Sequence, residues 1–168
     1  MNKCNHHCIL SRFVDIIEKM TENKRRIIKR LFLVSFFIFV SAAFINNLTR
    51  DVYSGDIGDL VTAAYVFGVA HPPGYPLLTF LGFVLSHLPL SIPPVSKVAL
   101  LSVISSLSAF FFLYKFCFMQ TKNFFISILS VSILAFSYMF WFFAEIPEVF
   151  ALNNLFVIAL FYFAIKFY

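Results

Sequence analysis

Five apolar segments dominate this sequence and restrict its fold more than any other feature. They cover residues 31–48, 75–90, 98–119, 124–143 and 149–167. Four of them approach or exceed the roughly 18 to 20 residues with which an α-helix crosses a hydrocarbon core of about 30 Å. Hydrophobic residues make up 61% of the chain, which excludes an ordinary soluble domain. The sequence therefore predicts an all-α polytopic membrane protein.

The segment 75–90 is the exception, because prolines limit its helix to about 18 Å between Pro76 and Pro89. We expect it to lie along the membrane interface or to dip into it. A second surface helix should precede it, since apolar residues recur at helical spacing after Asp56. The predicted architecture has a long external loop, residues 49–97, that carries both surface helices. The four predicted spans cover about residues 31–48, 98–119, 124–143 and 149–167.

A basic cluster just before the first span sets the expected orientation. Its members are Lys24, Arg25, Arg26, Lys29 and Arg30. Positive charge beside a span favours the cytoplasmic side, so we expect residues 1–30 to form a cytoplasmic tail. The first span should then be an uncleaved anchor, with the membrane domain covering residues 31–168. Because the basic residues have this orienting role, the net charge of +5 does not indicate nucleic-acid binding.

The start of the tail holds Cys4, His6, His7 and Cys8, whose side chains are of the type that binds zinc. Four donors within five residues cannot all reach one tetrahedral ion, and no second pair follows. The sequence therefore favours a disordered tail over a metal site.

The charges also predict which loops share a side of the membrane. If the segment 75–90 does not cross, Lys115 and Lys122 lie in the cytoplasm with the tail. The carboxylates that follow the first span then all lie on the non-cytoplasmic surface; they are Asp51, Asp56, Asp59, Glu145 and Glu148. Acidic groups from two separate loops are thus expected on one face.

Asp56 and Asp59 stand at the start of the first surface helix, and two interpretations remain open. Asp56 could be the N-cap, with Asp59 placed favourably at the positive end of the helix dipole. Alternatively, a carboxylate here could act as a general base that deprotonates an acceptor hydroxyl at the water–lipid boundary.

His71 opens the sequence His-Pro-Pro-Gly, which has a clear structural explanation. Pro72 disfavours the helical conformation at His71, and Pro73 and Gly74 favour a tight turn. Such a turn would also fix the imidazole in one place, where it could contact a phosphate.

Glu145 and Glu148 flank Pro147 just before the last span. Glu148 suits the positive end of a helix, and this alone could explain it. Carboxylates from two loops on one face could also bind a divalent cation, orient an acceptor or shift each other's pKa. Asn153 lies one turn inside the span, where an amide needs protein or water as a partner.

Two motifs resemble those of glycosyltransferase family 117, a family of GT-C-type membrane enzymes that includes protein O-mannosyltransferases. Residues 55–88, GDIGDLVTAAYVFGVAHPPGYPLLTFLGFVLSHL, resemble the first external loop, where the family pattern is approximately GDSGE followed by HPPGYPL. Residues 148–156, EVFALNNLF, are similar to the family's EV(Y/F)xLN signature. The motifs occur in the family's order, so the resemblance implies a GT-C-like N-terminal half.

The resemblance implies transfer of a sugar such as mannose from a polyprenyl-phosphate carrier to a protein or lipid hydroxyl. Asp56 matches the presumed base, and Asp59 stands where the family usually has Glu. His71 matches the histidine near the donor phosphate, and Glu148 matches the acid of the second loop. Ile57 replaces the usual small serine and is expected to crowd the turn beside the base.

Family members have more spans than the four expected here, so we interpret the chain as an incomplete N-terminal fragment. The alternative is a catalytically inactive remnant or a membrane assembly subunit. A small transporter fits less well, because the charges lie at the membrane boundaries and not at the midplane. A bacterial inner membrane and the endoplasmic reticulum both fit this topology, and the bacterial style of the chain favours the former.

Overall fold

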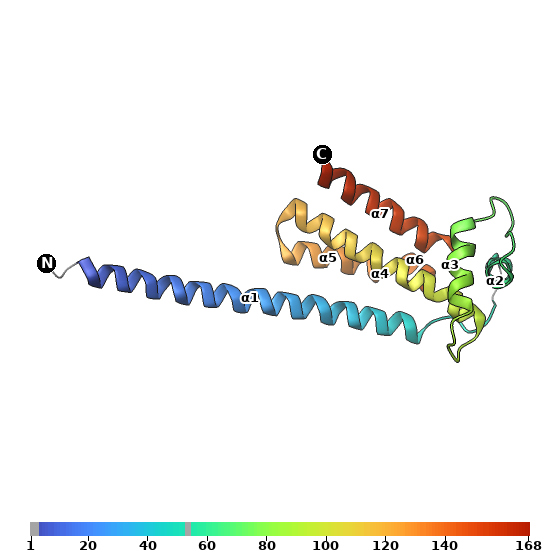
Figure 1. Ribbon diagram of the computed structural model, residues 1–168, viewed down its shortest axis with the longest axis horizontal. Coiled ribbons are helices and arrows are strands. Elements are labelled where there is room, and N and C mark those ends of the chain that lie inside the picture. Colours follow the sequence, from blue (N-terminus) through green and yellow to red (C-terminus); the bar gives the residue numbers. More distant parts are fainter. Residues whose placement is uncertain (1–3, 53–54) are drawn as a thin grey trace. The chain divides into compact units, whose positions relative to one another are not determined.

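The computed structural model describes residues 4–52 and 55–168, with side chains described from Met20 onward. All regular structure in these ranges is helical, which confirms the predicted all-α class. The helices are α1 (Cys4–Asn46), α2 (Ile57–Val66), α3 (Pro76–Ser86), α4 (Pro94–Thr121), α5 (Phe124–Ala135), α6 (Tyr138–Glu145) and α7 (Val149–Phe167) (Figure 1). In the described part of the chain, three helices are long and apolar enough to cross a membrane, or four if α5 and α6 form one span. The chain is therefore a polytopic membrane protein.

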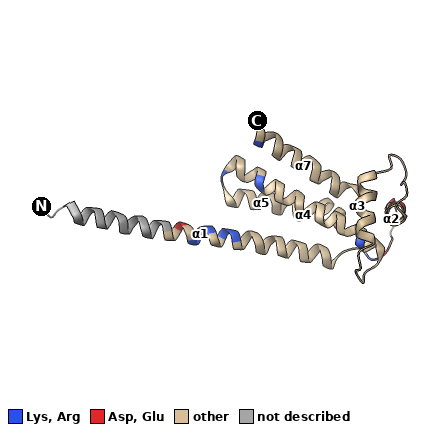
Figure 2. Ribbon diagram, viewed as in Figure 1, with Lys and Arg blue, Asp and Glu red and all other residues tan. Residues whose placement is uncertain are grey.

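The chain divides into two compact units, Met1–Ile38 and Phe39–Tyr168. The first unit is formed by most of α1 and carries the basic cluster before Leu31 (Figure 2). Residues expected to form a disordered tail are helical from Cys4 onward. The side chains of Cys4, His6, His7 and Cys8 lie outside the described ones.

In the second unit, α4 is the central helix and packs against α2, α3, α5, α6 and α7. Phe44, near the C-terminal end of α1, is fully buried and contacts the rings of Phe110 on α4 and Trp141 on α6. At the far end of α4, Lys122 adopts a left-handed conformation that ends the helix. The Asn123 side chain then accepts hydrogen bonds from the first amides of α5, at 2.9 and 3.3 Å.

The segment 124–143, predicted as one span, is divided into α5 and α6, which meet at a bend of 66°. The break falls at Phe136 and Ser137. The backbone N–H and the hydroxyl of Ser137 both donate to the carbonyl of Leu134, at 3.2 and 2.8 Å. This tighter turn takes the place of the regular α-helical pattern and redirects the chain.

The two short helices predicted in the first loop are both present, and α2 begins directly after Asp56. Helix α3 has 11 residues and crosses the direction of α4 and α7, so it does not extend the bundle (Figure 1). The two short helices approach closely at Gly82, where a Cβ atom would lie 2.9 Å from the Cβ of Ala64. Ile57 was expected to crowd the turn beside Asp56. It is instead only 3% exposed and packs with Val61, so its side chain points into the core and anchors α2.

Candidate active site

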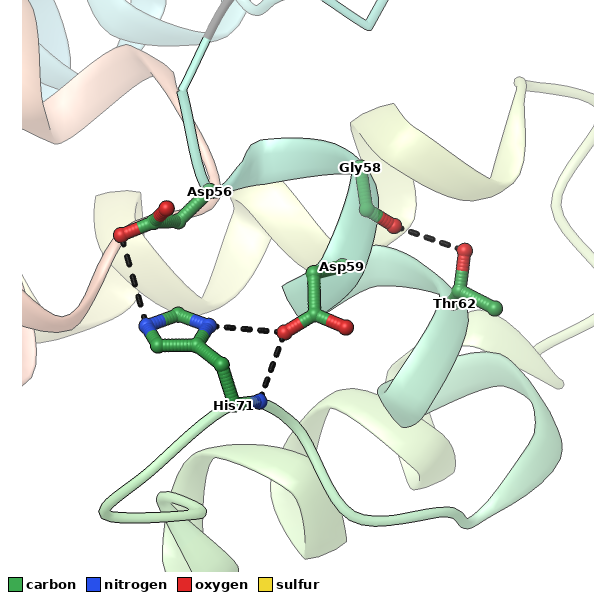
Figure 3. A network of polar contacts seen from close by, with 5 residues as sticks. All are labelled: Asp56, Gly58, Asp59, Thr62 and His71. Carbon is green, nitrogen blue, oxygen red and sulfur yellow. Dashed lines mark hydrogen bonds and ion pairs between the residues drawn. The ribbon is translucent and has the colours of Figure 1, made fainter.

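The His71 imidazole lies between the carboxylates of Asp56 and Asp59 (Figure 3). Its Nδ1 is 2.7 Å from Oδ2 of Asp59, and its Nε2 is 3.4 Å from Oδ2 of Asp56. The same Asp59 oxygen also accepts a hydrogen bond from the backbone N–H of His71, at 2.8 Å. The histidine is thus held from two sides, and most firmly by Asp59.

The start of α2 explains how both carboxylates reach the histidine. Asp56 occupies the N-cap position, but its side chain makes no capping hydrogen bond. Asp59 follows three residues later in the first turn, and this spacing places both side chains on neighbouring parts of one helix surface. Capping therefore does not account for the Asp56 carboxylate, which is directed toward His71 (Figure 3).

The turn after α2 places the histidine. The N–H of Gly74 donates to the carbonyl of His71 at 2.8 Å, and Gly74 has a φ of +89°, a value that favours glycine. The Tyr75 ring then contacts the His71 ring edge to face, with 5.6 Å between the ring centres. The predicted turn is present, and it places the imidazole beside α2.

The contacts shift the ionisation of this pair in opposite directions. Hydrogen bonds from the backbone and the ring of His71 lower the pKa of the Asp59 carboxyl. The hydrogen bond to Asp59 raises the pKa of His71, and the negative charges of Asp56, Asp59 and Glu148 add to this effect. The arrangement therefore favours an imidazolium that faces two carboxylates.

Glu148 joins this group from the other acidic loop, at the N-cap position of α7. Burial raises the pKa of its carboxyl, while the Val149 N–H opposes the shift. The charge of Asp56 raises this pKa further, and that of His71 lowers it. Glu148 of the second acidic loop therefore lies within electrostatic range of Asp56 and His71 of the first.

Glu145 lies in a cavity of about 450 Å³ next to this group. Glu148 and Ile57 also line the cavity, together with Asn47 at the end of α1.

The loop after α1 is held in place here, because the Thr49 N–H donates to the Glu145 carbonyl at 3.1 Å. The buried hydroxyl of Ser96 in turn donates to the Thr49 carbonyl at 2.6 Å. Glu145 is therefore close to the site without touching His71.

Asn153 lies in a different place, an apolar groove of about 370 Å³ between the starts of α3 and α7. Tyr75 lines the same groove and connects it to His71. Asn47 and Tyr75 were not among the predicted site residues. Asn47 directly follows the first apolar segment and Tyr75 belongs to the HPPGYP motif, so position alone could have indicated both.

Within residues 20–52 and 55–168, no three His, Cys, Asp or Glu side chains are arranged to hold a metal ion. The carboxylates of the site can accept protons and hydrogen bonds, whereas the His71 imidazolium donates them. A carboxylate of this site could therefore take a proton from a hydroxyl group that binds beside it.

Comparison with known proteins identifies the family. Residues 56–168 match the N-terminal domain of protein O-mannosyl-transferase TMEM260. The chain belongs to the protein O-mannosyl-transferase TMEM260 family. The match begins at Asp56, the second residue of the first motif, and includes the rest of that motif and all of the second. The resemblance to a membrane O-mannosyltransferase is thus confirmed.

Two TMEM260 relatives show the extent of the similarity. The chain is 38% identical over 124 residues to protein O-mannosyl-transferase tmem260 of Dictyostelium discoideum. The aligned region covers 71% of this chain and 15% of the relative. It is 38% identical over 128 residues to protein O-mannosyl-transferase TMEM260 of Mus musculus, which covers 74% of this chain and 18% of the relative. The chain thus spans less than a fifth of these relatives. No solved structure matches it significantly.

Both relatives are eukaryotic, so they give no support to the bacterial inner membrane expected from composition.

Proposed function

We propose that the chain forms the membrane-embedded N-terminal part of a protein O-mannosyltransferase. The donor would be a polyprenyl-phosphate-linked mannose, and the acceptor a hydroxyl on the non-cytoplasmic face. The observation that supports this best is the Asp56–His71–Asp59 arrangement beside an apolar groove. The names of the relatives add support for the transfer of mannose to protein.

In this proposal Asp56 is the general base. The acceptor oxygen attacks the anomeric carbon of the sugar, and its proton passes to the Asp56 carboxylate. The bond from that carbon to the phosphate oxygen breaks, and the carrier phosphate leaves with the electron pair. Asp56 suits this role because its side chain is 63% exposed and its contact with His71 is long, at 3.4 Å.

Asp59 would position His71, because one Asp59 oxygen already accepts both hydrogen bonds from that residue. His71 could contact the donor phosphate through Nε2 only by exchanging Asp56 for the phosphate. That exchange would break the contact between Asp56 and His71, so the Asp56 carboxylate would become available to the acceptor hydroxyl when the donor is bound. Donor binding would thereby prepare the base.

The apolar groove would hold the start of the carrier's hydrocarbon chain. Its walls include Leu78, Leu152 and Phe156, and Asn153 adds an amide near the membrane boundary.

The test is mannose transfer from polyprenyl-phosphate mannose to an acceptor peptide, in membranes that express the whole gene product. We expect Asp56→Asn to reduce transfer by about 100-fold or more, since removal of a general base has effects of this size. Asp51→Asn is the matched control, because Asp51 is exposed in the same loop and lies outside the His71 contacts. It should transfer at the wild-type rate.

Wild-type activity in Asp56→Asn would exclude Asp56 as the base. Absence of transfer by the wild type, at normal expression, would instead favour the alternative of an inactive remnant or an assembly subunit.

A further inference from the structure

The cavity that contains Glu145 differs from the neighbouring groove in the chemistry of its walls. It has a volume of about 450 Å³, within the range of about 300 to 1,000 Å³ found for small-ligand sites. The rings of Phe142 and Phe143 form part of its wall, while Asn47, Glu145 and Glu148 supply an amide and two carboxylates. A ligand that fits must therefore present both an apolar face and several hydrogen-bond donors.

A pyranose ring has this combination of surfaces. Its axial C–H groups form an apolar face that can lie against an aromatic ring, and its hydroxyls donate to carboxylate and amide oxygens. An alkyl chain would leave the two carboxylates without partners, and burying them in this way is unfavourable. The cavity is thus suited to a sugar and not to the hydrocarbon part of a lipid.

Glu145 provides a second, independent indication. Its Oε1 atom is buried and has no hydrogen-bond partner among the described residues. The side chains of Asn47 and Trp141 lie close enough to interact with the same carboxyl group. Since buried polar atoms are nearly always paired, the unpaired Oε1 would gain a partner if the Glu145 side chain turned toward the cavity and met a hydrogen-bond donor of a bound ligand.

The position of the cavity connects it to the proposed chemistry. Glu148 lines the cavity and interacts electrostatically with Asp56 and His71. Ile57, the residue next to Asp56, lines the cavity as well. A ring bound here would therefore lie against Glu148, which interacts electrostatically with Asp56 and His71. On the apolar side, the Tyr75 ring contacts His71 and also lines the groove between α3 and α7.

We infer that this cavity binds the sugar ring of the lipid-linked donor, with Glu145 and Asn47 as hydrogen-bond partners and Phe142 as an aromatic wall. The inference rests on the proposed function for the nature of the donor. It assigns the sugar to the cavity at α6 and the carrier chain to the groove between α3 and α7.

Direct binding tests this assignment without any need for turnover. The whole gene product in nanodiscs would be titrated with polyprenyl-phosphate mannose and, separately, with polyprenyl phosphate that lacks the sugar. We expect Glu145→Gln to weaken binding of the sugar-bearing lipid by about tenfold or more, as for loss of a hydrogen bond to a charged group. Phe142→Leu, which keeps an apolar side chain but removes the ring, should also weaken it. Binding of the sugar-free lipid should not change in either variant.

Phe125→Leu is the matched control, because Phe125 is an exposed ring at the start of α5, outside the cavity. It should bind both lipids like the wild type. Equal weakening of both lipids by Glu145→Gln, or no effect on either, would overturn the assignment.

A mannosylated peptide distinguishes the other possible source of the ring. If Glu145→Gln weakened binding of this peptide and left the donor lipid unaffected, the cavity would bind acceptor sugars and the donor assignment would be wrong. The protein could show no transfer while Glu145→Gln still weakens binding of the sugar-bearing lipid only. That result would refute the proposed function and leave the sugar-binding assignment standing.

Discussion

At the scale of single residues, the two aspartates at the start of α2 have different surroundings and therefore different expected roles. Asp59 is tied to the backbone and the ring of His71, whereas Asp56 has one long contact and an exposed side chain. A carboxylate that already accepts two hydrogen bonds is a poorer proton acceptor than one that is free. The geometry thus separates a positioning residue from the proposed base, although sequence alone could not distinguish them.

The ionisation of His71 gives a prediction at this scale. Replacing Asp59 with Asn removes the main cause of the raised pKa of His71, so this pKa should fall. NMR titration of the His71 ring in detergent micelles measures it directly. An unchanged His71 midpoint in Asp59→Asn would show that the hydrogen bond does not form. Asp51→Asn, outside the contact, serves as the control and should leave the midpoint at the wild-type value.

The sign of the pH dependence follows from the same contacts. Because the pKa of His71 is raised, its contribution to the folded site is present at low pH and is lost as pH rises through that raised value. Because the pKa of Asp59 is lowered, its contribution is lost only as pH falls through the lowered value. The ion pair exists between these limits, and the order of the turn at His71 should be greatest there.

At the scale of helices, the close approach of α2 and α3 holds the site together. A methyl group at Gly82 would lie 2.9 Å from the Cβ of Ala64, which is fixed to its own helix and cannot rotate away. Gly82→Ala should therefore push the helices apart at a cost of about 1 to 3 kcal/mol, partly offset by about 1 kcal/mol from the better helix propensity of alanine. Thermal unfolding in micelles should show a lower midpoint.

A second substitution tests whether the clash is the cause. Ala64→Gly removes the methyl group that Gly82→Ala would meet, so the double variant should be more stable than the two single effects predict when added. Simple additivity would mean that the two helices do not touch at this point.

The helices also show how far sequence patterns predict this fold. The surface helix after Asp56 and the short helix after Pro76 are both present, because helical spacing and proline positions are local signals. The bend between α5 and α6 contains no proline or glycine that would mark it in the sequence, and the Ser137 hydroxyl bonds to the backbone there. Hydropathy alone therefore predicts one continuous span over residues 124–143. The cavity beside Glu145 depends on Asn47 and Phe142, which are far apart in the sequence, and local patterns do not reveal such a meeting.

At the scale of the whole molecule, the charges separate along the second unit. Asp56, Asp59 and Glu148 lie at the starts of α2 and α7, whereas Lys122 ends α4 and Lys166 lies in the last turn of α7. Two basic residues, Arg50 and Lys97, lie in the loop and first turn at the acidic end, so the separation is partial. Positive charge favours the cytoplasmic side, so this separation supports the proposal that the acidic end is non-cytoplasmic.

Cysteine labelling tests the sidedness. In a background with Cys4, Cys8 and Cys117 replaced by Ser, Asp51→Cys should react with a membrane-impermeant maleimide from the non-cytoplasmic side. Lys122→Cys should react only after the membrane is permeabilised, because it follows one further crossing. Labelling of both positions from the same side would contradict the four-span arrangement.

The hydrogen bonds of Thr49 with Ser96 and Glu145 join segments that the ribosome makes at different times. Thr49 emerges from the ribosome well before Glu145, so the wall that contains Glu145 and Glu148 is added last. Until then, Asp56 and His71 can meet, but the cavity beside them has no α6 side. Ribosome-bound chains that end before α6 should therefore carry the proton-accepting residues without the place where a substrate is held.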